Sequence, residues 1–352
     1  MNILIDARPL CIRSPGGVTR VAKQLLDELF ALEQPHSFFL GTTGATRPLL
    51  PWQESPQRIH LHRTIPNKVA STLTATGLSS FDRFFPRANA DHLLLLNIGH
   101  VGRPRLPYTL LVHDLTFLTE PRWYSAHARL WHPVVHARRL IQEATTLLTL
   151  TQYVRSDLES QLHIPSSRIQ QLPFFPTLVG TPAELPEQLR GKQFLFGLGH
   201  GDRRKNAEAT IQAWRVLRQE PEWKELALVL TTREPIPPPS EPGLSFIPFP
   251  SDELVSALYK HAAVFVYPSW SEGYGVPLQE AARFGTPCIA SSGSALEETA
   301  PTGTLFTPPE KPHLLVAALR AHLLAPKQSA QREIPPSNQS AGRTLLQYLT
   351  GK

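Results

Sequence analysis

Short apolar runs alternate along the chain with longer segments whose apolar residues recur every three or four positions. The first pair is a strand predicted at Ile3–Ile5 and a helix over residues 18–30, because a repeat near 3.6 residues belongs to a helix with one buried face. Further strands are predicted at Leu93–Leu96, Leu110–Val112, Leu147–Leu150, Phe194–Leu198, Leu226–Leu230, Val264–Tyr267 and Cys288–Ala290. Further helices are predicted near residues 125–143, 153–162, 207–218, 252–262, from 277, 313–324 and 342–349. This alternation is typical of parallel sheets covered by helices.

Residues 173–189 interrupt this pattern with prolines and glycine, a composition typical of a linker. The sequence therefore predicts two doubly wound α/β lobes, residues 1–175 and 176–337, followed by a final helix within about 338–352. Ligands of such sheets bind outside the carboxyl ends of the strands, so the predicted site is a cleft between the lobes. The pattern over residues 60–90 is too weak for a detailed prediction.

Composition narrows the class of protein. An apolar fraction of 41% over 352 residues is that of a globular enzyme and excludes a disordered chain. A net charge of +6 predicts an anionic partner: a sugar nucleotide, a phosphorylated glycan, an anionic membrane or nucleic acid. Cys11 and Cys288 make neither a disulfide framework nor a metal site. With no secretory signal or membrane span recognisable, a soluble cytoplasmic protein is expected, with peripheral contact at the inner membrane face left open.

The segment from Tyr267 to Glu298 carries the most chemistry. After the strand that ends near Pro268 comes a glycine-bearing loop, Gly273, Tyr274 and Gly275, which leads into a helix through Val276. A loop that enters a helix presents backbone N–H groups and the positive end of the helix dipole, which suits a phosphate or sugar hydroxyls. Glu272 and Glu280 lie on either side of this loop and can accept hydrogen bonds from hydroxyls.

This segment resembles the Glu-Gly loop signature of family 4 retaining glycosyltransferases, in particular their bacterial mannosyltransferase-like members. The spacing of Glu272 and Glu280 matches, and Tyr274 stands where the family commonly has Phe. Arg204, Lys205 and Asn206 resemble the family's Arg-Lys-Asn, with Asn206 predicted to cap the following helix. Nucleic-acid binding is not expected, because no recognisable module carries the basic residues.

Two further segments extend the resemblance into the first half of the chain. Pro15, Gly16 and Gly17 resemble the family's glycine loop near the donor phosphate and the acceptor, where glycine permits close approach and positive φ. His113 follows the strand at Leu110–Val112, and the resemblance implies that it contacts the donor hexose. The likeness runs from Gly16 to Glu298 and is weakest over residues 35–90.

The resemblance implies a GT-B fold, in which the helix within about 338–352 joins the first lobe. It also implies a metal-independent hexosyltransferase with no cofactor, in polysaccharide biosynthesis. Arg204 and Lys205 would neutralise the departing diphosphate, Glu272 would bind the hexose, and Glu280 the ribose. GDP-mannose is the first expected donor, with UDP- and ADP-hexoses as alternatives, and the acceptor is a glycan or lipid-linked sugar. A sugar-nucleotide 2-epimerase and a non-catalytic binding protein of the same fold remain the alternatives. Base, acceptor, linkage and oligomeric state are not encoded in these motifs.

Overall fold

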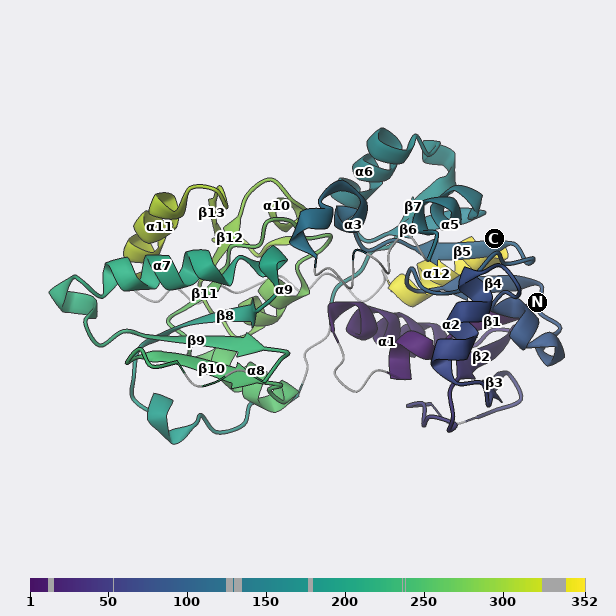
Figure 1. The fold of residues 1–352 in the computed structure, drawn as a ribbon, viewed down its shortest axis with the longest axis horizontal. Coiled ribbons are helices and arrows are strands. Elements are labelled where there is room, and N and C mark those ends of the chain that lie inside the picture. Colours follow the sequence, from purple (N-terminus) through teal and green to yellow (C-terminus); the bar gives the residue numbers. More distant parts are fainter. Residues whose placement is uncertain are drawn as a thin grey trace. The chain divides into compact units, whose positions relative to one another are not determined.

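The computed structural model describes residues 1–11, 16–52, 54–124, 129, 135–176, 180–235, 237, 239–324 and 340–351. The chain divides into two compact units. Unit 1 comprises residues 1–121, 125–175 and 336–352, and unit 2 comprises residues 122–124 and 176–335. Each unit is built on one parallel sheet, as the alternation of apolar runs and helical segments predicts (Figure 1).

Unit 1 has a sheet of seven strands in the order β3-β2-β1-β4-β5-β6-β7, with every adjacent pair parallel. The strands are β1 (Asn2–Asp6), β2 (Ser37–Thr43), β3 (Arg58–Arg63), β4 (His92–Leu95), β5 (Tyr108–Leu111), β6 (Thr146–Thr149) and β7 (Ile169–Gln171). The helices are α1 (Gly17–Phe30), α2 (Asn67–Ala75), α3 (Thr116–Thr119), α5 (Ala137–Glu143), α6 (Gln152–Leu162) and α12 (Ala341–Thr350). The order reverses at β1 and β4, which is the arrangement of a doubly wound sheet.

Unit 2 has a sheet of six parallel strands in the order β10-β9-β8-β11-β12-β13. The strands are β8 (Phe194–His200), β9 (Ala227–Thr232), β10 (Leu244–Pro248), β11 (Val264–Tyr267), β12 (Cys288–Ser291) and β13 (Leu305–Thr307). The helices are α7 (Ala207–Leu217), α8 (Asp252–His261), α9 (Val276–Arg283), α10 (Leu296–Thr299) and α11 (Pro312–Leu324). Here the order reverses between β8 and β11, so the loops that follow these two strands lie at the switch point of the sheet.

Both faces of the second sheet are buried, and β11 shows how its sequence achieves this. Val264 and Val266 pack into one core cluster with α7 and α11, whereas Phe265 and Tyr267 pack into the other with α8 and α9. Figure 1 shows these helices on the two faces of the sheet. Successive residues of a strand point to opposite faces, so an all-apolar run is needed when helices cover both.

The helix α12 packs against α1 within unit 1, although the whole of unit 2 separates them along the chain. Gly342 makes this close crossing possible, because a Cβ there would lie 2.5 Å from the Glu28 carbonyl carbon and the Leu29 nitrogen. The Glu28 carboxylate also accepts hydrogen bonds from the Gly342 backbone N–H at 3.0 Å and the Ser340 hydroxyl at 2.9 Å.

The sequence pattern left several elements without a prediction. The strands β2, β3 and β10 and the helix α2 are among them. About half of the predicted helix over residues 125–143 lies outside the described residues, and α5 covers its last part. Across the part of the chain that the structure describes, no helix is long and apolar enough to span a bilayer.

Candidate functional site

Two cations and one carboxylate meet at the switch point of the unit 2 sheet. Glu272 lies in the loop after β11, and Arg204 and Lys205 lie in a 3-10 turn after β8. The Arg204 guanidinium donates to Glu272 Oε2 at 3.0 Å, and the Lys205 ammonium donates to Glu272 Oε1 at 2.7 Å. All three side chains are largely buried, with exposed fractions of 18%, 16% and 8% for Arg204, Lys205 and Glu272.

The sheet brings these residues together although 67 positions separate Lys205 from Glu272. Strands β8 and β11 are parallel neighbours, with Val266 paired to Gly197, so both carboxyl ends meet at one edge. The two following loops are also joined directly. The Trp270 backbone N–H donates to the Arg204 carbonyl at 2.8 Å, which fixes the turn against the Glu-Gly loop.

The charged residues of this cluster shift one another's pKa values. Burial alone would raise the pKa of Glu272, but Arg204 and Lys205 outweigh it and lower the pKa to about 2. Burial lowers the pKa of Lys205, and the Glu272 carboxylate opposes that shift. Glu272 is therefore ionised at neutral pH. One carboxylate between two cations leaves an excess of positive charge, which suits an anionic ligand.

Asn206 occupies the predicted position but does not play the predicted role. It is the N-cap residue of α7, with a left-handed φ of 52°, yet its side chain makes no capping hydrogen bond. Its amide instead donates to the carbonyl oxygen of Pro268 at 3.1 Å and reaches that of Pro309 at 3.4 Å. The predicted cap is therefore wrong, because the side chain is used to tie the start of α7 to the end of β11.

The Glu-Gly loop has one glycine that no other residue could replace without strain. Gly275 has a φ of 91°, and a Cβ there would lie 2.4 Å from Leu296 Cδ2. The helix α9 begins at Val276, so Pro277 is its second residue rather than its first as the sequence suggested. Pro is tolerated in a first helical turn because the N–H groups there have no partner within the helix.

Glu280 has a tyrosine partner on α8. It is 4% exposed on α9, and the Tyr259 hydroxyl donates to its Oε2 at 3.2 Å. The two glutamates of the motif therefore have different tyrosine partners, because the Tyr267 hydroxyl donates to Glu272 Oε1 at 3.0 Å. Neither tyrosine was identified from the sequence. Tyr267 is the last strand residue before Pro268, and an aromatic residue in a buried strand is expected to serve the core.

The predicted residues of unit 1 lie at the start of α1 and after β5. Gly16 is the N-cap of α1 with φ −100°, and Gly17 is absent from the positive-φ glycines, so positive φ is not used at either position. A Cβ on Gly17 would meet nothing within 4 Å, which leaves open space above the helix start. Pro15 lies outside the described residues.

His113 has a defined hydrogen-bonding state. Its Nε2 lies 2.9 Å from the Leu96 carbonyl oxygen. A carbonyl only accepts, so Nε2 carries the proton. Burial lowers the pKa of His113 below its usual 6.5. The ring is therefore neutral at pH 7, and Nδ1 is a hydrogen-bond acceptor.

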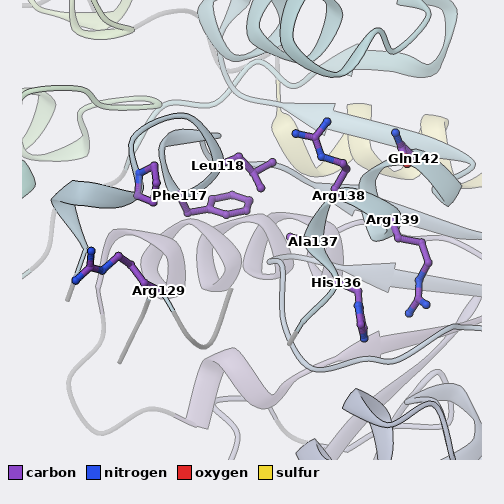
Figure 2. Close-up of a pocket in the computed structure, with 9 residues that line it drawn as sticks. Phe117, Leu118, Arg129, His136, Ala137, Arg138, Arg139 and Gln142 are labelled. Carbon is purple, nitrogen blue, oxygen red and sulfur yellow. The ribbon is translucent and has the colours of Figure 1, made fainter. Parts of the chain in front are cut away.

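A pocket of about 460 Å³ lies elsewhere in unit 1 (Figure 2). It is lined by Phe117, Leu118, Pro121, Arg129, His136, Ala137, Arg138, Arg139 and Gln142. Figure 2 shows Arg138 and Arg139 pointing in opposite directions, so their charges do not converge on one ligand. None of the predicted site residues lines this pocket.

Comparison with known proteins agrees with the motifs. Residues 192–324 match the family described as glycosyl transferases group 1. The chain is 26% identical over 243 residues to the O-antigen chain mannosyltransferase B of Escherichia coli, covering 63% of this chain and 62% of the relative. It is 30% identical over 187 residues to the MMP alpha-(1->4)-mannosyltransferase of Mycolicibacterium hassiacum, covering 50% of this chain and 44% of that relative. The chain thus spans less than two thirds of either relative.

Among solved structures, the chain is similar to a sucrose-phosphate synthase from Thermosynechococcus elongatus, with a TM-score of 0.70 and 18% identity. The superposition covers 99% of this chain and 94% of the synthase. The predicted α/β fold of the GT-B kind is therefore confirmed. The predicted resemblance to glycosyltransferases is confirmed by the family match over residues 192–324 and by the two relatives. The assignment of the individual site residues stays a prediction.

Proposed function

We propose, on the premise that residues 192–324 form a glycosyl transferases group 1 domain, that this protein transfers a hexose from a sugar nucleotide to a sugar acceptor. Both curated relatives described above are mannosyltransferases by name. Mannose is therefore the proposed sugar and GDP-mannose the first donor, with UDP- and ADP-hexoses as the alternatives.

The observation that carries the proposal is the buried cluster of Arg204, Lys205 and Glu272. A guanidinium and an ammonium that share one carboxylate keep an excess positive charge at the carboxyl edge of a parallel sheet. A nucleoside diphosphate is the anion that a sugar-nucleotide reaction releases. Positive charge placed in advance at that position stabilises the leaving group without reorganisation during the reaction.

The proposed chemistry needs no carboxylate nucleophile. The bond between the hexose C1 and the diphosphate oxygen breaks, and the acceptor oxygen bonds to C1 on the same face. The acceptor proton goes to the departing phosphate oxygen. Arg204 and Lys205 neutralise the diphosphate, Glu272 accepts from hexose hydroxyls, and Glu280 accepts from the ribose. Since Glu272 is already bound by two cations, it serves as an acceptor of hydrogen bonds and not as a nucleophile.

His113 and the glycines of both loops complete the proposed site. His113 Nδ1 would accept a hydrogen bond from a donor hydroxyl, since Nε2 is already bound to Leu96. Gly16 and Gly17 would allow the donor phosphate to approach the backbone. The N–H groups from Gly273 to Val276 would contact the hexose. The reaction is proposed to need no metal, and to take place in the cytoplasm or at the inner membrane face on a glycan or lipid-linked acceptor.

The test is thermal unfolding with GDP, UDP and ADP in the presence of EDTA. A ligand that binds only the folded state at 100 times its Kd stabilises it by about 2.7 kcal/mol. We expect GDP to raise the midpoint of the wild type, and Arg204→Ala and Glu280→Ala to abolish the rise. Arg203→Ala is the matched control, because Arg203 is exposed in the same turn and should leave the rise intact. If none of the three nucleotides raises the wild-type midpoint, the proposal fails.

A further inference from the structure

We propose that Tyr267 is a positioning residue that sets Lys205 and Glu272 for the donor diphosphate. This inference rests on the proposed function, and it concerns a residue that the motif comparison treats as the end of a strand. Tyr267 is the last residue of β11 and is 1% exposed. Its hydroxyl lies between the two charged groups of opposite sign that the proposed reaction needs.

The tyrosine contacts Lys205 in two ways. The Lys205 ammonium donates to the Tyr267 hydroxyl oxygen, and it also lies 4.7 Å from the centroid of the Tyr267 ring. The same ammonium donates to Glu272 Oε1. Its position is therefore defined by a ring face, a hydroxyl and a carboxylate. A flexible lysine side chain has little other restraint on its end group.

The direction of the hydrogen bond between Tyr267 and Glu272 follows from chemistry. An ionised carboxylate only accepts, so the hydroxyl donates to Glu272 Oε1 at 3.0 Å. The hydroxyl oxygen keeps a lone pair for Lys205. Burial raises the pKa of Tyr267, with the Glu272 charge adding to the shift, so the phenol stays protonated through the neutral range.

Oxygen Oε1 of Glu272 thus has two donors, Lys205 and Tyr267, whereas Oε2 accepts from Arg204. When a diphosphate arrives, Lys205 can turn toward it while the tyrosine hydroxyl still satisfies Oε1. Without that hydroxyl, a Lys205 that turned toward the diphosphate would leave the buried Oε1 short of a hydrogen-bond donor, which is unfavourable. We therefore infer that the hydroxyl makes Lys205 available to the diphosphate.

The ring of Tyr267 is held firmly enough for this role. It belongs to the core cluster that α8 and α9 cover, and its ring lies 5.6 Å from that of Phe265 with an interplanar angle of 24°. A residue locked by packing on a central strand places its hydroxyl more accurately than one on a loop.

Tyr259 provides an internal comparison. It lies in the same core cluster, is also 1% exposed, and donates its hydroxyl to Glu280 rather than Glu272. In the proposed site Glu280 binds the ribose. Loss of the Tyr259 hydroxyl should therefore affect the nucleoside part of the donor, and loss of the Tyr267 hydroxyl the diphosphate part.

The experiment measures binding of inorganic pyrophosphate, guanosine and GDP, in EDTA, to the wild type and to three Tyr→Phe variants of the full chain. For Tyr267→Phe we expect about tenfold weaker binding of pyrophosphate and GDP and unchanged binding of guanosine. For Tyr259→Phe we expect weaker guanosine and GDP binding and unchanged pyrophosphate binding. Tyr108→Phe removes a buried hydroxyl in unit 1, where it donates to the Leu140 carbonyl, and should change none of the three.

The outcomes separate this inference from the proposed function. If the wild type binds pyrophosphate and GDP and Tyr267→Phe binds both equally well, the inference is overturned and the proposed function stands. If Tyr267→Phe weakens guanosine as much as pyrophosphate, its role is general folding of the unit, which also overturns the inference. If the wild type binds neither GDP nor pyrophosphate, the inference is overturned, whereas the proposed function falls only if UDP and ADP also leave the wild-type midpoint unchanged.

Discussion

Glu272 illustrates how far single residues could be interpreted from the sequence. Its place in the Glu-Gly loop marked it as a functional candidate, and the same holds for Arg204 and Lys205. Their mutual contact was not predictable, because it spans 67 and 68 positions and depends on β8 and β11 being neighbours in the sheet. The spacing of a motif identifies candidate residues. Which charged residues contact one another can be known only from the order of the strands in the sheet.

Acid should weaken the folded state through Glu272. The pKa of this carboxyl is depressed from 4.5 to about 2, so its stabilising contribution is complete above about pH 4.5 and is lost as pH falls toward 2. The shift corresponds to about 3 kcal/mol, at 1.36 kcal/mol for each pKa unit. Urea unfolding of the wild type and Glu272→Gln should differ most near pH 7 and converge toward pH 2. The exposed Glu222→Gln should follow the wild type throughout, and a pH-independent difference for Glu272→Gln would contradict this account.

His113 should stay neutral where an ordinary histidine gains charge. Burial lowers its pKa below 6.5, so the ring remains an acceptor at Nδ1 through neutral pH. NMR titration of the Cε1–H signal, identified by its loss in His113→Asn, should show a midpoint below 6.5. A midpoint above 7 would mean that a cation, and not a neutral acceptor, lies at this strand end at neutral pH.

At the scale of elements, the sequence predicted buried strands best where several aliphatic residues are consecutive. The strands β4, β6 and β9 lie within a residue or two of their predicted positions. The strand β10 escaped prediction because a serine interrupts its apolar residues, Leu244, Phe246 and Ile247, and a proline ends it. It lies at the sheet edge, where such residues are tolerated. Periodicity alone detects an edge strand poorly, since only part of it must be apolar.

The turn before α9 should tolerate no side chain at Gly275. Both its φ of 91° and the 2.4 Å approach of Leu296 oppose a Cβ. Gly303→Ala is the matched control, because its φ is 87° while nothing lies within 4 Å of a Cβ there. Chemical unfolding should show Gly275→Ala less stable than Gly303→Ala by about 1–3 kcal/mol, the usual cost of overpacking. Equal losses would show that Leu296 moves aside without cost.

At the scale of the whole molecule, each unit has its own buried core. A substitution in one unit can therefore change the stability of that unit alone. The sequence predicted two lobes from the repeated alternation and the proline-rich stretch between them. The sequence did not show how the final helix is held in unit 1. The structure shows that Gly342 lets α12 pack directly on the backbone of α1.

A methyl group at Gly342 should therefore weaken unit 1 alone. Gly342→Ala places a Cβ 2.5 Å from the backbone of Glu28 and Leu29, so the two helices must separate. We expect a loss of about 1–3 kcal/mol, observed in calorimetry as an earlier transition of unit 1. The transition of unit 2 should stay at its wild-type temperature. Gly99→Ala is the control, because nothing lies within 4 Å of a Cβ there. An equal loss in both transitions would contradict the independence of the units.

The same contact sets an order of events on the ribosome. Unit 1 contains a segment made before unit 2 and a segment made after it. The helix α1 therefore lacks its partner α12 until all of unit 2 has been synthesised. At about 5–20 residues per second, the chain between α1 and α12 takes roughly fifteen to sixty seconds to synthesise. During that time the surface of α1 around Glu28 and Leu29 has no partner helix, and unit 2 can fold first. The first lobe to be translated is thus the last to be finished, and its unfinished face is the one that a chaperone would meet.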